Sequence, residues 1–384
     1  MDVTVIGGGV SGLVYAICAS RAGNSVTLIE SNQRVGKKLL LTGAGRCNLT
    51  NVNLNSKAYN NPVFVKKIFE EVPFGEYEKF VNSCGIYLSK PDDEGRVYPI
   101  TYSSASVCDC LRFSAMRSGV KVICNALVEK IKKTKDGFSV CFNGKDVVSK
   151  RVVVAVGSSS QATNVNLDQL VGKQFLTNMA PSLAPMKVRL VAKSLSGVRA
   201  RCLIALKKDN HTIAEELGEV QFRDFGLSGI CTFNMSSYVA RTRAKGDKSR
   251  FDLHIDFLPS FSAQQLKSIL LHRIKEGYGD EIFVGLLPNK IAEWIKKQNL
   301  SKDIDRYVEK IKNTVFEDAN PVDFALSQVT SGGVDVKYLD ETLTLPNGIT
   351  VVGEALDVDG LCGGYNLHFA VVSAIYASKK LSNN

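Results

Sequence analysis

The stretch DVTVIGGGVSG, residues Asp2–Gly12, joins a β-branched run to the pattern G-x-G-x-x-G. Residues 13–22 are compatible with a helix, and Val26–Ile29 is a second apolar run that ends at Glu30. A buried parallel strand that leads through a glycine-rich turn into a helix, and then into a second strand, is a β-α-β unit. The stretch therefore predicts an α/β fold built on a Rossmann-like parallel sheet.

Three glycines of this turn have separate roles in a dinucleotide-binding unit. Gly7 makes the tight turn, Gly9 lets the backbone approach a pyrophosphate, and Gly12 lets the helix pack closely on the strand. The helix that begins near Val10 and Ser11 offers unpaired N–H groups and the positive end of its dipole to a phosphate. A glycine-rich turn in an ordinary α/β protein is the alternative interpretation of the pattern alone.

A carboxylate follows where dinucleotide-binding units hold a ribose. Glu30 lies 18 residues after Gly12, and Ser31 stands beside it. A carboxylate accepts hydrogen bonds from a ribose diol and repels a 2′-phosphate. Strand, turn, helix, second strand and acid together favour the binding of a dinucleotide that lacks this phosphate.

Length and composition indicate a globular protein with two or three domains. The chain has 384 residues, of which 45% are hydrophobic and 22% charged. No run reaches the roughly 18 uncharged apolar residues of a membrane span, and a strand that starts at residue 2 leaves no room for a signal peptide. The ten cysteines form no C-x-x-C and the four histidines show no ligand spacing. We therefore expect a cytoplasmic protein with buried thiols, no metal site and no membrane partner.

The formal net charge of +10 leaves two interpretations open. Dispersed basic residues give solubility and bind phosphates, whereas a basic patch binds nucleic acid. Because the basic residues are widely spread, we favour the first interpretation. A local cluster keeps RNA binding open as an alternative; its members are Arg241, Arg243, Lys245, Lys248 and Arg250.

A basic, glycine-rich loop follows the first β-α-β unit. Ser31–Asn48 has neither helical nor strand periodicity, and its glycines, which all lie within Gly36–Asn48, give the backbone the freedom to wrap around a bound group. Lys37, Lys38 and Arg46 carry charges that suit a pyrophosphate. The position of the loop favours the wrapping of a cofactor over an ordinary surface connection.

This loop resembles the G-K-K-L-L-x-[ST]-G-G-G-R-C-N signature of the HI0933-like flavoprotein family, with Ala44 in place of a glycine. Gly95–Pro99 is similar to the family's G-R-V-[FY]-P, and Gly353–Leu367 is similar to its G-E-x-L-D-x-D-G-x-x-G-G-Y-N-L. The family includes NAD(P)/FAD-dependent oxidoreductases, aminoacetone oxidases and a bile-acid enone reductase. The similar motifs extend over the whole chain.

The resemblance implies an FAD-binding domain of the glutathione-reductase type, with FAD bound tightly and non-covalently. Residues 1–185 and 320–384 would form this discontinuous domain, residues 186–260 an inserted β-domain, and residues 261–319 a small helical cap. FAD suits the chain better than NAD because three separated segments would contact the cofactor. The candidate cofactor-binding residues are Gly7, Gly9, Val10, Ser11, Gly12, Glu30, Ser31, Lys37, Lys38, Thr42, Gly43, Arg46, Cys47, Asn48, Leu127, Val128, Ala155, Val156, Gly157, Gly353, Glu354, Gly363, Gly364, Tyr365, Asn366 and Leu367.

Further elements follow from local patterns. Asp136–Gly137 and Asn143–Gly144 suit tight turns and predict a three-stranded meander, whose last strand we expect over Val147–Val156. Flavoproteins of the glutathione-reductase type have A-T-G where this chain has Ala155–Gly157. The loop at residues 158–168 departs from the family pattern, so its role stays open. In the insertion we expect short strands, among them Thr232–Met235, and three helices. These helices are Ser262–Lys275, Pro288–Lys297 and Lys302–Val315.

The chemistry that the resemblance implies is hydride transfer at flavin N5 to or from a small organic substrate. Reduction of an enone with NAD(P)H and oxidation of an amine with O₂ both fit, and NAD(P)H would dock transiently because no second G-x-G-x-x-G follows Gly157. Arg46, Asp357 and His368 are candidate catalytic residues by position. Two alternatives stay open, a flavoprotein that acts on RNA and a protein whose FAD is structural or regulatory. The sequence fixes neither the substrate nor the oligomeric state.

Overall fold

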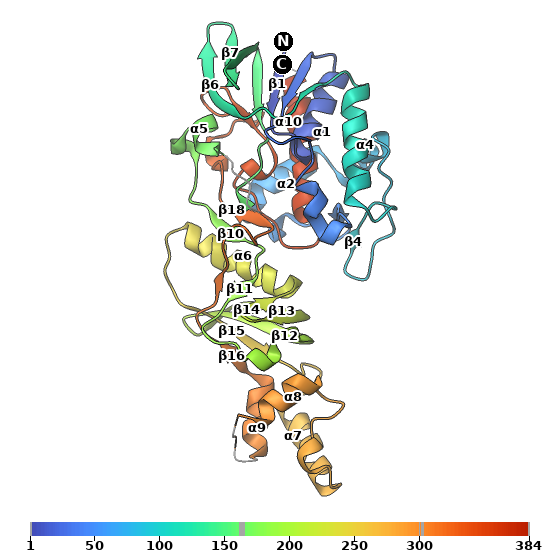
Figure 1. Cartoon of the computed structure of the whole chain (residues 1–384), viewed down its shortest axis with the longest axis vertical. Helices are drawn as coiled ribbons and strands as arrows, with labels where there is room; N and C mark the ends of the chain where they lie inside the picture. The colour runs from blue at the N-terminus through green and yellow to red at the C-terminus, as the bar shows by residue number, and fades with distance from the viewer. Residues whose placement is uncertain (1, 161–165, 299, 301–302, 383–384) are drawn as a thin grey trace. The chain divides into compact units, whose positions relative to one another are not determined.

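The computed structural model describes residues 2–160, 166–298, 300 and 303–382. The chain forms two compact units, one of Met1–Ala180 with Gln328–Asn384 and one of Pro181–Ser327, which we call the first and the second unit (Figure 1). The second unit is an insertion in the sequence of the first. Within the described ranges, no helix combines the length and the apolar character that crossing a membrane requires.

The first unit is built on a five-stranded parallel sheet. In spatial order its strands are β19 (Thr350–Val351), β9 (Arg151–Val154), β1 (Val3–Ile6), β2 (Val26–Ile29) and β5 (Lys121–Ile123). The register runs from Val3↔Val26 on one side of β1 and from Val3↔Arg151 on the other. Every residue of β1 and β2 is buried, as expected for β-branched strands that are covered on both faces.

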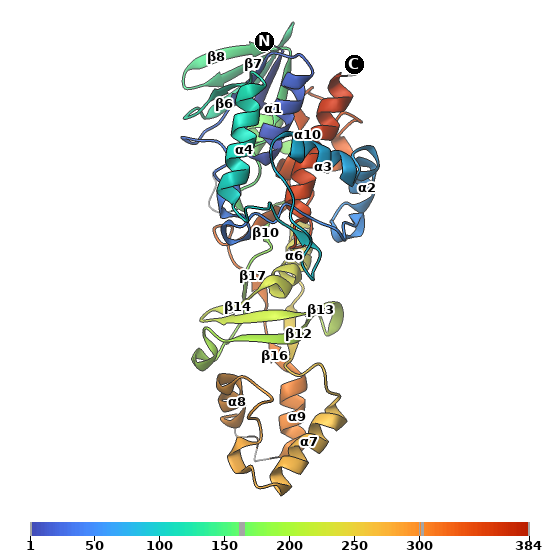
Figure 2. The ribbon, with the colours of Figure 1, turned by 90° about the vertical axis from the view of Figure 1, so that its right-hand side faces the viewer.

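Two helices of the first unit, α4 and α10, pack against α1, which follows β1 in the chain (Figure 2). α10 also contacts α2. Leu13 and Ile17 of α1 join the strand residues in one hydrophobic cluster. The helices are α1 (Val10–Arg21), α2 (Pro62–Glu71), α3 (Phe74–Ser83), α4 (Ser104–Arg117), α5 (Leu167–Val171) and α10 (Tyr365–Ser382).

The predicted meander is present, but its last strand is shorter than expected. The antiparallel strands are β6 (Val128–Thr134), β7 (Gly137–Phe142) and β8 (Lys145–Ser149). The expected single strand Val147–Val156 is wrong, because the chain leaves the meander after Ser149 and enters the parallel sheet as β9. One apolar run thus serves two sheets, which its composition alone does not reveal.

Short elements complete the first unit and its connections. The strands are β3 (Thr50–Asn51), β4 (Arg96–Val97), β10 (Ala180–Ser182) and β18 (Val329–Ser331), and the 3-10 helices are η1 (Leu39–Gly45), η2 (Ser56–Ala58), η4 (Lys173–Phe175), η7 (Val336–Tyr338) and η8 (Gly353–Ala355). β3 pairs with β4. η1 lies within the glycine-rich loop, where the sequence shows no helical periodicity.

The second unit contains a seven-stranded antiparallel sheet. In spatial order its strands are β16 (Thr314–Phe316), β15 (Phe251–Asp256), β12 (Arg199–Lys208), β13 (His211–Arg223), β14 (Gly226–Ser228), β11 (Met186–Lys187) and β17 (Asn320–Pro321). β12 pairs with β13 from Arg199↔Gln221 to Lys208↔His211. The long β12–β13 hairpin is the centre of this sheet.

A helix replaces one of the strands that we expected in the second unit. Thr232–Met235 lies inside α6 (Ile230–Ala244), which packs on β13, so that prediction is wrong. The segment contains neither Gly nor Pro, and α6 buries Met235 and Val239 in the hydrophobic cluster of this unit. Four residues with alternating polarity are too few to distinguish a strand from a helix that tertiary packing selects.

The three helices predicted near the end of the insertion are present. They are α7 (Ala263–Lys275), α8 (Asn289–Lys296) and α9 (Ile304–Lys312), and the 3-10 helices η5 (Lys193–Leu195) and η6 (Gly279–Glu281) also lie in this unit. Ser262 and Gln265 form a capping box at the start of α7. The third helix ends before β16, earlier than expected. Helices and sheet share one hydrophobic cluster, and a division into a β-domain and a cap remains a proposal.

Candidate cofactor site

The glycines of the glycine-rich turn are of two kinds. At Gly7 and Gly12 the fold has no room for a side chain, whereas at Gly9 there is open space. Gly7 has φ +104°, and a Cβ there would lie 2.5 Å from the carbonyl oxygen of Ala155. A Cβ at Gly12 would collide with the carbonyl oxygen of Gly7. Around a Cβ at Gly9 there is no atom within 4 Å. Packing therefore explains Gly7 and Gly12, whereas the space over Gly9 is available to a ligand.

The N-terminus of α1 faces this space with unpaired donors. Gly9 is its N-cap residue, no side chain caps the helix, and its first turn, which contains Val10 and Ser11, carries no acid. Amide groups without a capping side chain and the positive end of the helix dipole suit a phosphate. These features match the predicted pyrophosphate site.

Glu30 lies at the carboxyl ends of β1 and β2, where the sequence predicts a ribose site. Its buried carboxylate accepts hydrogen bonds from the amide of Gly8 at 2.7 Å and from the amide of Asn32 at 2.7 Å. The Ser31 hydroxyl donates to it at 3.2 Å, and Lys37 donates to Asn32 at 3.1 Å. The acid is thus fixed by the protein beside the glycine-rich turn.

The end of β9 borders the same turn, and the segment just before the meander is bonded to Glu30, whose carbonyl oxygen accepts from the Ala126 amide at 3.0 Å. The Ala155 amide donates to the carbonyl oxygen of Ile6 at 2.8 Å, and Gly157 after Val156 has φ +71°. Leu127 is 47% exposed, while Val128 beside it is buried. Residues 161–165 of the loop whose role we left open lie outside the described residues.

The glycine-rich loop Gly36–Asn48 is bound to the phosphate-binding turn at its start. The Gly36 amide donates to the carbonyl oxygen of Gly8 at 2.8 Å. Thr42 donates to the carbonyl oxygen of Leu39 at 2.7 Å within η1, which also contains Gly43. The wrapping loop and the turn that it was predicted to serve are therefore adjacent.

The end of this loop is conformationally strained and leaves a polar atom without a partner. Cys47 is buried and has φ 61°, a left-handed conformation that is unfavourable for a residue other than glycine. Burial raises the pKa of the Cys47 thiol to about 12, so the thiol is protonated and not nucleophilic. The next residue, Asn48, has a buried Oδ1 atom that accepts no hydrogen bond.

The C-terminal motif packs against both the turn and the loop. A Cβ at Gly353 would collide with Ser11 of α1, and one at Gly364 would lie 2.8 Å from Asn48 Oδ1. Asn366 exchanges two hydrogen bonds of 2.9 Å with the backbone of Gly360, which fixes the loop before α10.

The neighbouring residues of this motif hold the start of α10 in place. The hydroxyl of Tyr59 donates to the carbonyl oxygen of Tyr365 at 2.8 Å, and Asn51 donates to that of Gly363 at 3.0 Å. Leu367 is half-buried against the hydrophobic cluster. Three segments that are far apart in the sequence thus meet at one place.

Of the three candidate catalytic residues, two are engaged by the protein. His368 is 2% exposed, pairs with the Thr50 hydroxyl at 2.9 Å and packs 4.4 Å from the Tyr77 ring. Burial lowers the pKa of His368 to about 3, so its imidazole is neutral near pH 7. Asp357 accepts hydrogen bonds from Asn60 at 2.7 Å and Thr177 at 3.2 Å, while burial raises the pKa of its carboxyl group.

The third candidate, Arg46, is exposed and available to a ligand. Its guanidinium group lies 5.5 Å from the centre of the Tyr98 ring, and Tyr98 stacks on Tyr102 at 5.4 Å. A guanidinium group that stacks on a ring keeps its N–H edge free to donate. Sequence reasoning did not connect Tyr98 with Arg46, because the two residues meet only in the folded chain.

Sequence reasoning also missed three hydroxyl groups near the end of β19. Ser158 donates to Glu354 at 2.7 Å, and Ser160 lies beside both. Thr330 has a buried Oγ1 atom that makes no hydrogen bond. Its position in the stretch Thr330–Val334, which is similar to the family's T-x-G-G-V, is a signal that could have found it.

These features fit the FAD that the fold implies. The open space over Gly9 and the uncapped helix suit a diphosphate, and Glu30 suits a ribose. Asn48 Oδ1 and Thr330 Oγ1 are buried polar atoms without partners, and such atoms need a ligand or a water. All predicted cofactor residues lie in the first unit. Within the described ranges, no group of three potential metal ligands occurs.

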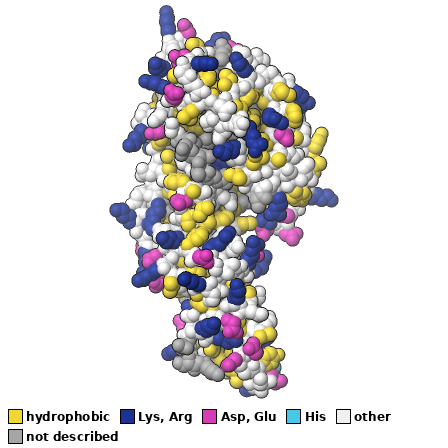
Figure 3. Space-filling view, viewed as in Figure 1, with side chains coloured by type: hydrophobic (Ala, Val, Ile, Leu, Met, Phe, Trp, Pro, Cys, Tyr) yellow, Lys and Arg dark blue, Asp and Glu magenta, His cyan; other side chains and the backbone are white. Residues whose placement is uncertain are grey.

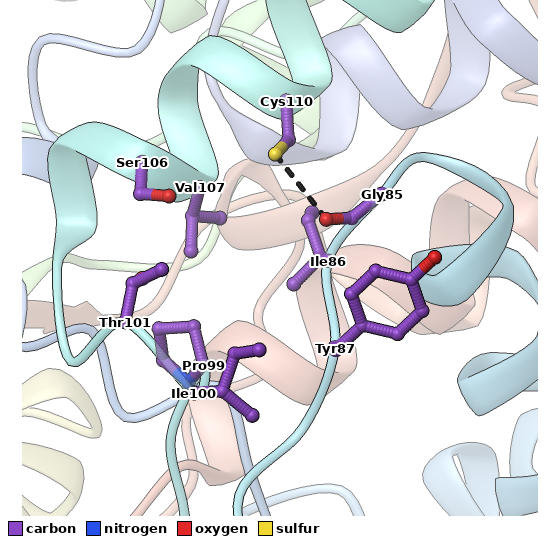
Figure 4. A pocket seen from close by; sticks show the side chains of 9 residues that line it. All are labelled: Gly85, Ile86, Tyr87, Pro99, Ile100, Thr101, Ser106, Val107 and Cys110. Carbon is purple, nitrogen blue, oxygen red and sulfur yellow. Dashed lines mark hydrogen bonds between the residues drawn. The ribbon is translucent and has the colours of Figure 1, made fainter.

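A pocket of the first unit has a lining that differs from the residues of the candidate cofactor site (Figure 4). Its lining is mainly apolar, with Ile86, Val107 and Ile100 around it and with Cys110 donating to the carbonyl oxygen of Gly85 at 3.5 Å. None of its lining residues is a predicted cofactor residue. We therefore assign no cofactor contact to it.

The basic cluster at residues 241–250 is largely engaged by neighbouring groups. Arg243 donates to the carbonyl oxygens of Asp247 and Ser249 and to Asn320, and Arg250 pairs with Asp252 at 3.0 Å. On the face drawn in Figure 3, Lys and Arg side chains are interspersed with Asp and Glu. This distribution favours dispersed charge over a basic patch.

Comparison with known proteins places the chain in a family. The HI0933-like protein Rossmann domain matches residues 1–380. A 3-dehydro-bile acid delta(4,6)-reductase from Clostridium scindens is 31% identical, over 98% of both chains. A ribosomal RNA dihydrouridine synthase from Haemophilus influenzae is 26% identical, also over 98% of both. The solved 3-ketosteroid-delta4-(5alpha)-dehydrogenase from Rhodococcus jostii is 14% identical, covers 98% of this chain and 96% of its own, and has a TM-score of 0.46.

The fold, the site and these comparisons define a flavoprotein oxidoreductase with a Rossmann-type FAD-binding domain. The chain belongs to the HI0933-like family. The predicted family, the predicted fold class and the assignment as an FAD-dependent oxidoreductase are confirmed.

Proposed function

We propose that the chain, with FAD bound, reduces a carbon–carbon double bond that is conjugated to a carbonyl group in a small organic substrate. The names of two relatives support this proposal, because one reduces the Δ4,6 system of a 3-dehydro bile acid and the other makes dihydrouridine. Dihydrouridine is uridine whose C5=C6 bond, conjugated to the C4 carbonyl, has been saturated. The two names thus describe the same bond change in unlike molecules.

Different residues of the site would bind different parts of the cofactor. FAD, when bound and reduced, supplies a hydride. The N-terminus of α1 at Gly9 would hold the diphosphate and Glu30 the ribose. Asn48 and the N-terminus of α10, which starts at Tyr365, would hold the polar edge of the flavin ring, where reduction places negative charge. Tight, non-covalent binding follows from contacts on three segments.

Arg46 should be needed for this binding. Arg46 lies two residues before Asn48, and the N–H groups of its guanidinium group are free to donate to a cofactor. The variant Arg46→Ala removes these donors and should therefore release FAD during gel filtration. The melting temperature of the cofactor-free protein should change little, because the side chain is exposed. The ratio of absorbance at 450 and 280 nm measures the retained flavin. Full retention of the yellow colour would contradict this role, and Arg306→Ala, an exposed arginine of the second unit, serves as the control.

Reduction by a nicotinamide is the first test of the function. In an anaerobic cuvette, NADPH or NADH should bleach the absorbance of the flavin near ~450 nm, and a 3-oxo-Δ4 steroid should then restore it. Mass spectrometry should show a product that is heavier by two hydrogens. A flavin that both nucleotides leave oxidised, but an amine reduces, would replace the proposal with amine oxidation by O₂. A flavin that no donor reduces would indicate a structural or regulatory cofactor.

Action on RNA is the second candidate, and the relative named as a ribosomal RNA dihydrouridine synthase favours it. The same reduced protein should then be reoxidised by unmodified ribosomal RNA but not by a steroid. Binding of RNA should weaken steeply as salt rises. Reoxidation by the steroid alone, without binding of RNA at low salt, would remove this candidate.

A further inference from the structure

An ion pair of low exposure joins the wrapping loop to the last strand of the parallel sheet. Lys38 Nζ lies 2.5 Å from Glu354 Oε2, and their side chains are 24% and 20% exposed. Ser158 donates to the same carboxylate at 2.7 Å and receives a hydrogen bond from Lys38 at 3.3 Å. Ser160 contacts both charged groups. The ion pair thus joins two residues that lie 316 positions apart in the sequence.

This pair lies beside the turn that we assign to the diphosphate. Gly353, directly before Glu354, packs against Ser11 in the first turn of α1. On the other side, Gly36 is hydrogen-bonded to Gly8 only two residues before Lys38. The two segments that carry the carboxylate and the ammonium group therefore pack against the first turn of α1 and the turn before it, and a Cβ at Gly157 would lie 3.9 Å from the Glu354 carboxylate.

A carboxylate at this place opposes the binding of a diphosphate. Like charges at short distance repel each other, and partial burial reduces the screening by water. Within the described residues, Lys38 is the cation that forms an ion pair with Glu354. We propose that Lys38 is a positioning residue that neutralises Glu354, so that the diphosphate of FAD can bind at α1, and that it fastens the wrapping loop.

Two roles of Lys38 give opposite results in a double variant. If Lys38 compensates the charge of Glu354, the need for Lys38 disappears once Glu354 is neutral. If Lys38 instead binds a phosphate directly, neutral Glu354 does not help. Glutamine at position 354 keeps the acceptor for Ser158 and removes the charge, so it separates the two roles.

The experiment measures the dissociation constant of FAD. The cofactor-free full chain is titrated into FAD, and the quenching of the flavin fluorescence reports binding. Lys38→Met should weaken binding at least about tenfold, which corresponds to about 1.4 kcal/mol. Lys38→Met with Glu354→Gln should restore binding to within about threefold of the wild type. Glu354→Gln alone should weaken FAD binding by no more than about threefold, and so less than Lys38→Met does, because glutamine keeps polar contacts at a candidate cofactor residue while it removes the charge. A double variant as weak as Lys38→Met, or a tenfold loss in Glu354→Gln, would overturn the proposal.

Lys312→Met is the matched control for loss of an ion pair. Lys312 pairs with Asp256 in the second unit, and their side chains are 19% and 15% exposed. This variant should lower the melting temperature without changing the affinity for FAD. Because binding rather than turnover is measured, failure of this test leaves the proposed reduction of a double bond unaffected, and the reverse also holds.

Discussion

Alanine at Gly9 should leave the protein folded and weaken FAD binding by at least about a hundredfold, whereas alanine at Gly12 should destabilise the first unit itself. The two positions lie three residues apart in one turn, and both substitutions add a single methyl group. At Gly9 this group meets no protein atom within 4 Å, and φ is −73°. At Gly12 it collides with the carbonyl oxygen of Gly7.

The two variants should differ because protein atoms fill the space beside Gly12, whereas the space beside Gly9 is open. The carbonyl of Gly7 belongs to the turn between β1 and α1 and has no room to move, so overpacking there costs about 3 kcal/mol or more. Space over Gly9 is where a backbone must approach a pyrophosphate closely, and a methyl group prevents this approach.

Two measurements check this pair of variants. Urea unfolding gives the free energy of unfolding of each cofactor-free variant, and quenching of flavin fluorescence gives its affinity for FAD. Gly144→Ala in the turn between β7 and β8 also adds a methyl group to open space, although its φ of +69° brings backbone strain. It should leave the affinity unchanged. If Gly9→Ala binds FAD like the wild type, the assignment of the open space to the diphosphate is wrong.

Acid should destabilise the protein through His368. The folded chain holds a neutral imidazole with a pKa of about 3, against 6.5 for an exposed histidine. Above pH 6.5 neither state binds this proton. Between pH 6.5 and 3 the unfolded chain binds it and the folded chain does not, so the free energy of unfolding falls by about 1.4 kcal/mol per pH unit.

The variant His368→Gln isolates this contribution. Between pH 7.5 and 5.0 the wild type should lose about 2 kcal/mol more stability than the variant, because glutamine does not titrate. Glutamine can still bond to Thr50, although it packs less well against the Tyr77 ring. Urea unfolding at the two pH values gives the numbers. An equal loss in both proteins would show that His368 is accessible to protons in the folded state, which would support it as a catalytic residue.

The sequence by itself determined the β-α-β unit and supplied the residues of the candidate cofactor site, which stay a prediction. The spacing of the glycines reflects a tight turn and close helix packing, which is a local pattern. The contact of Gly12 is with Gly7 in the same turn, whereas the atom that excludes a side chain at Gly7 belongs to Ala155, far along the chain. The position of Glu30, 18 residues after Gly12, corresponds to the length of the β-α-β unit and is therefore readable from the sequence. Similarity of motifs then linked the wrapping loop and the C-terminal segment to the same family.

Only the tertiary structure decided which of these residues act on one another. The pairing of Lys38 with Glu354, the support of Arg46 by Tyr98 and the buried environment of His368 all join residues that are distant in the sequence. The same holds for Thr232–Met235, where packing on β13 selected a helix, and for the run Val147–Val156, which two sheets share. Spacing along a chain records local backbone geometry, whereas burial and charge pairing depend on which segments meet when the core forms.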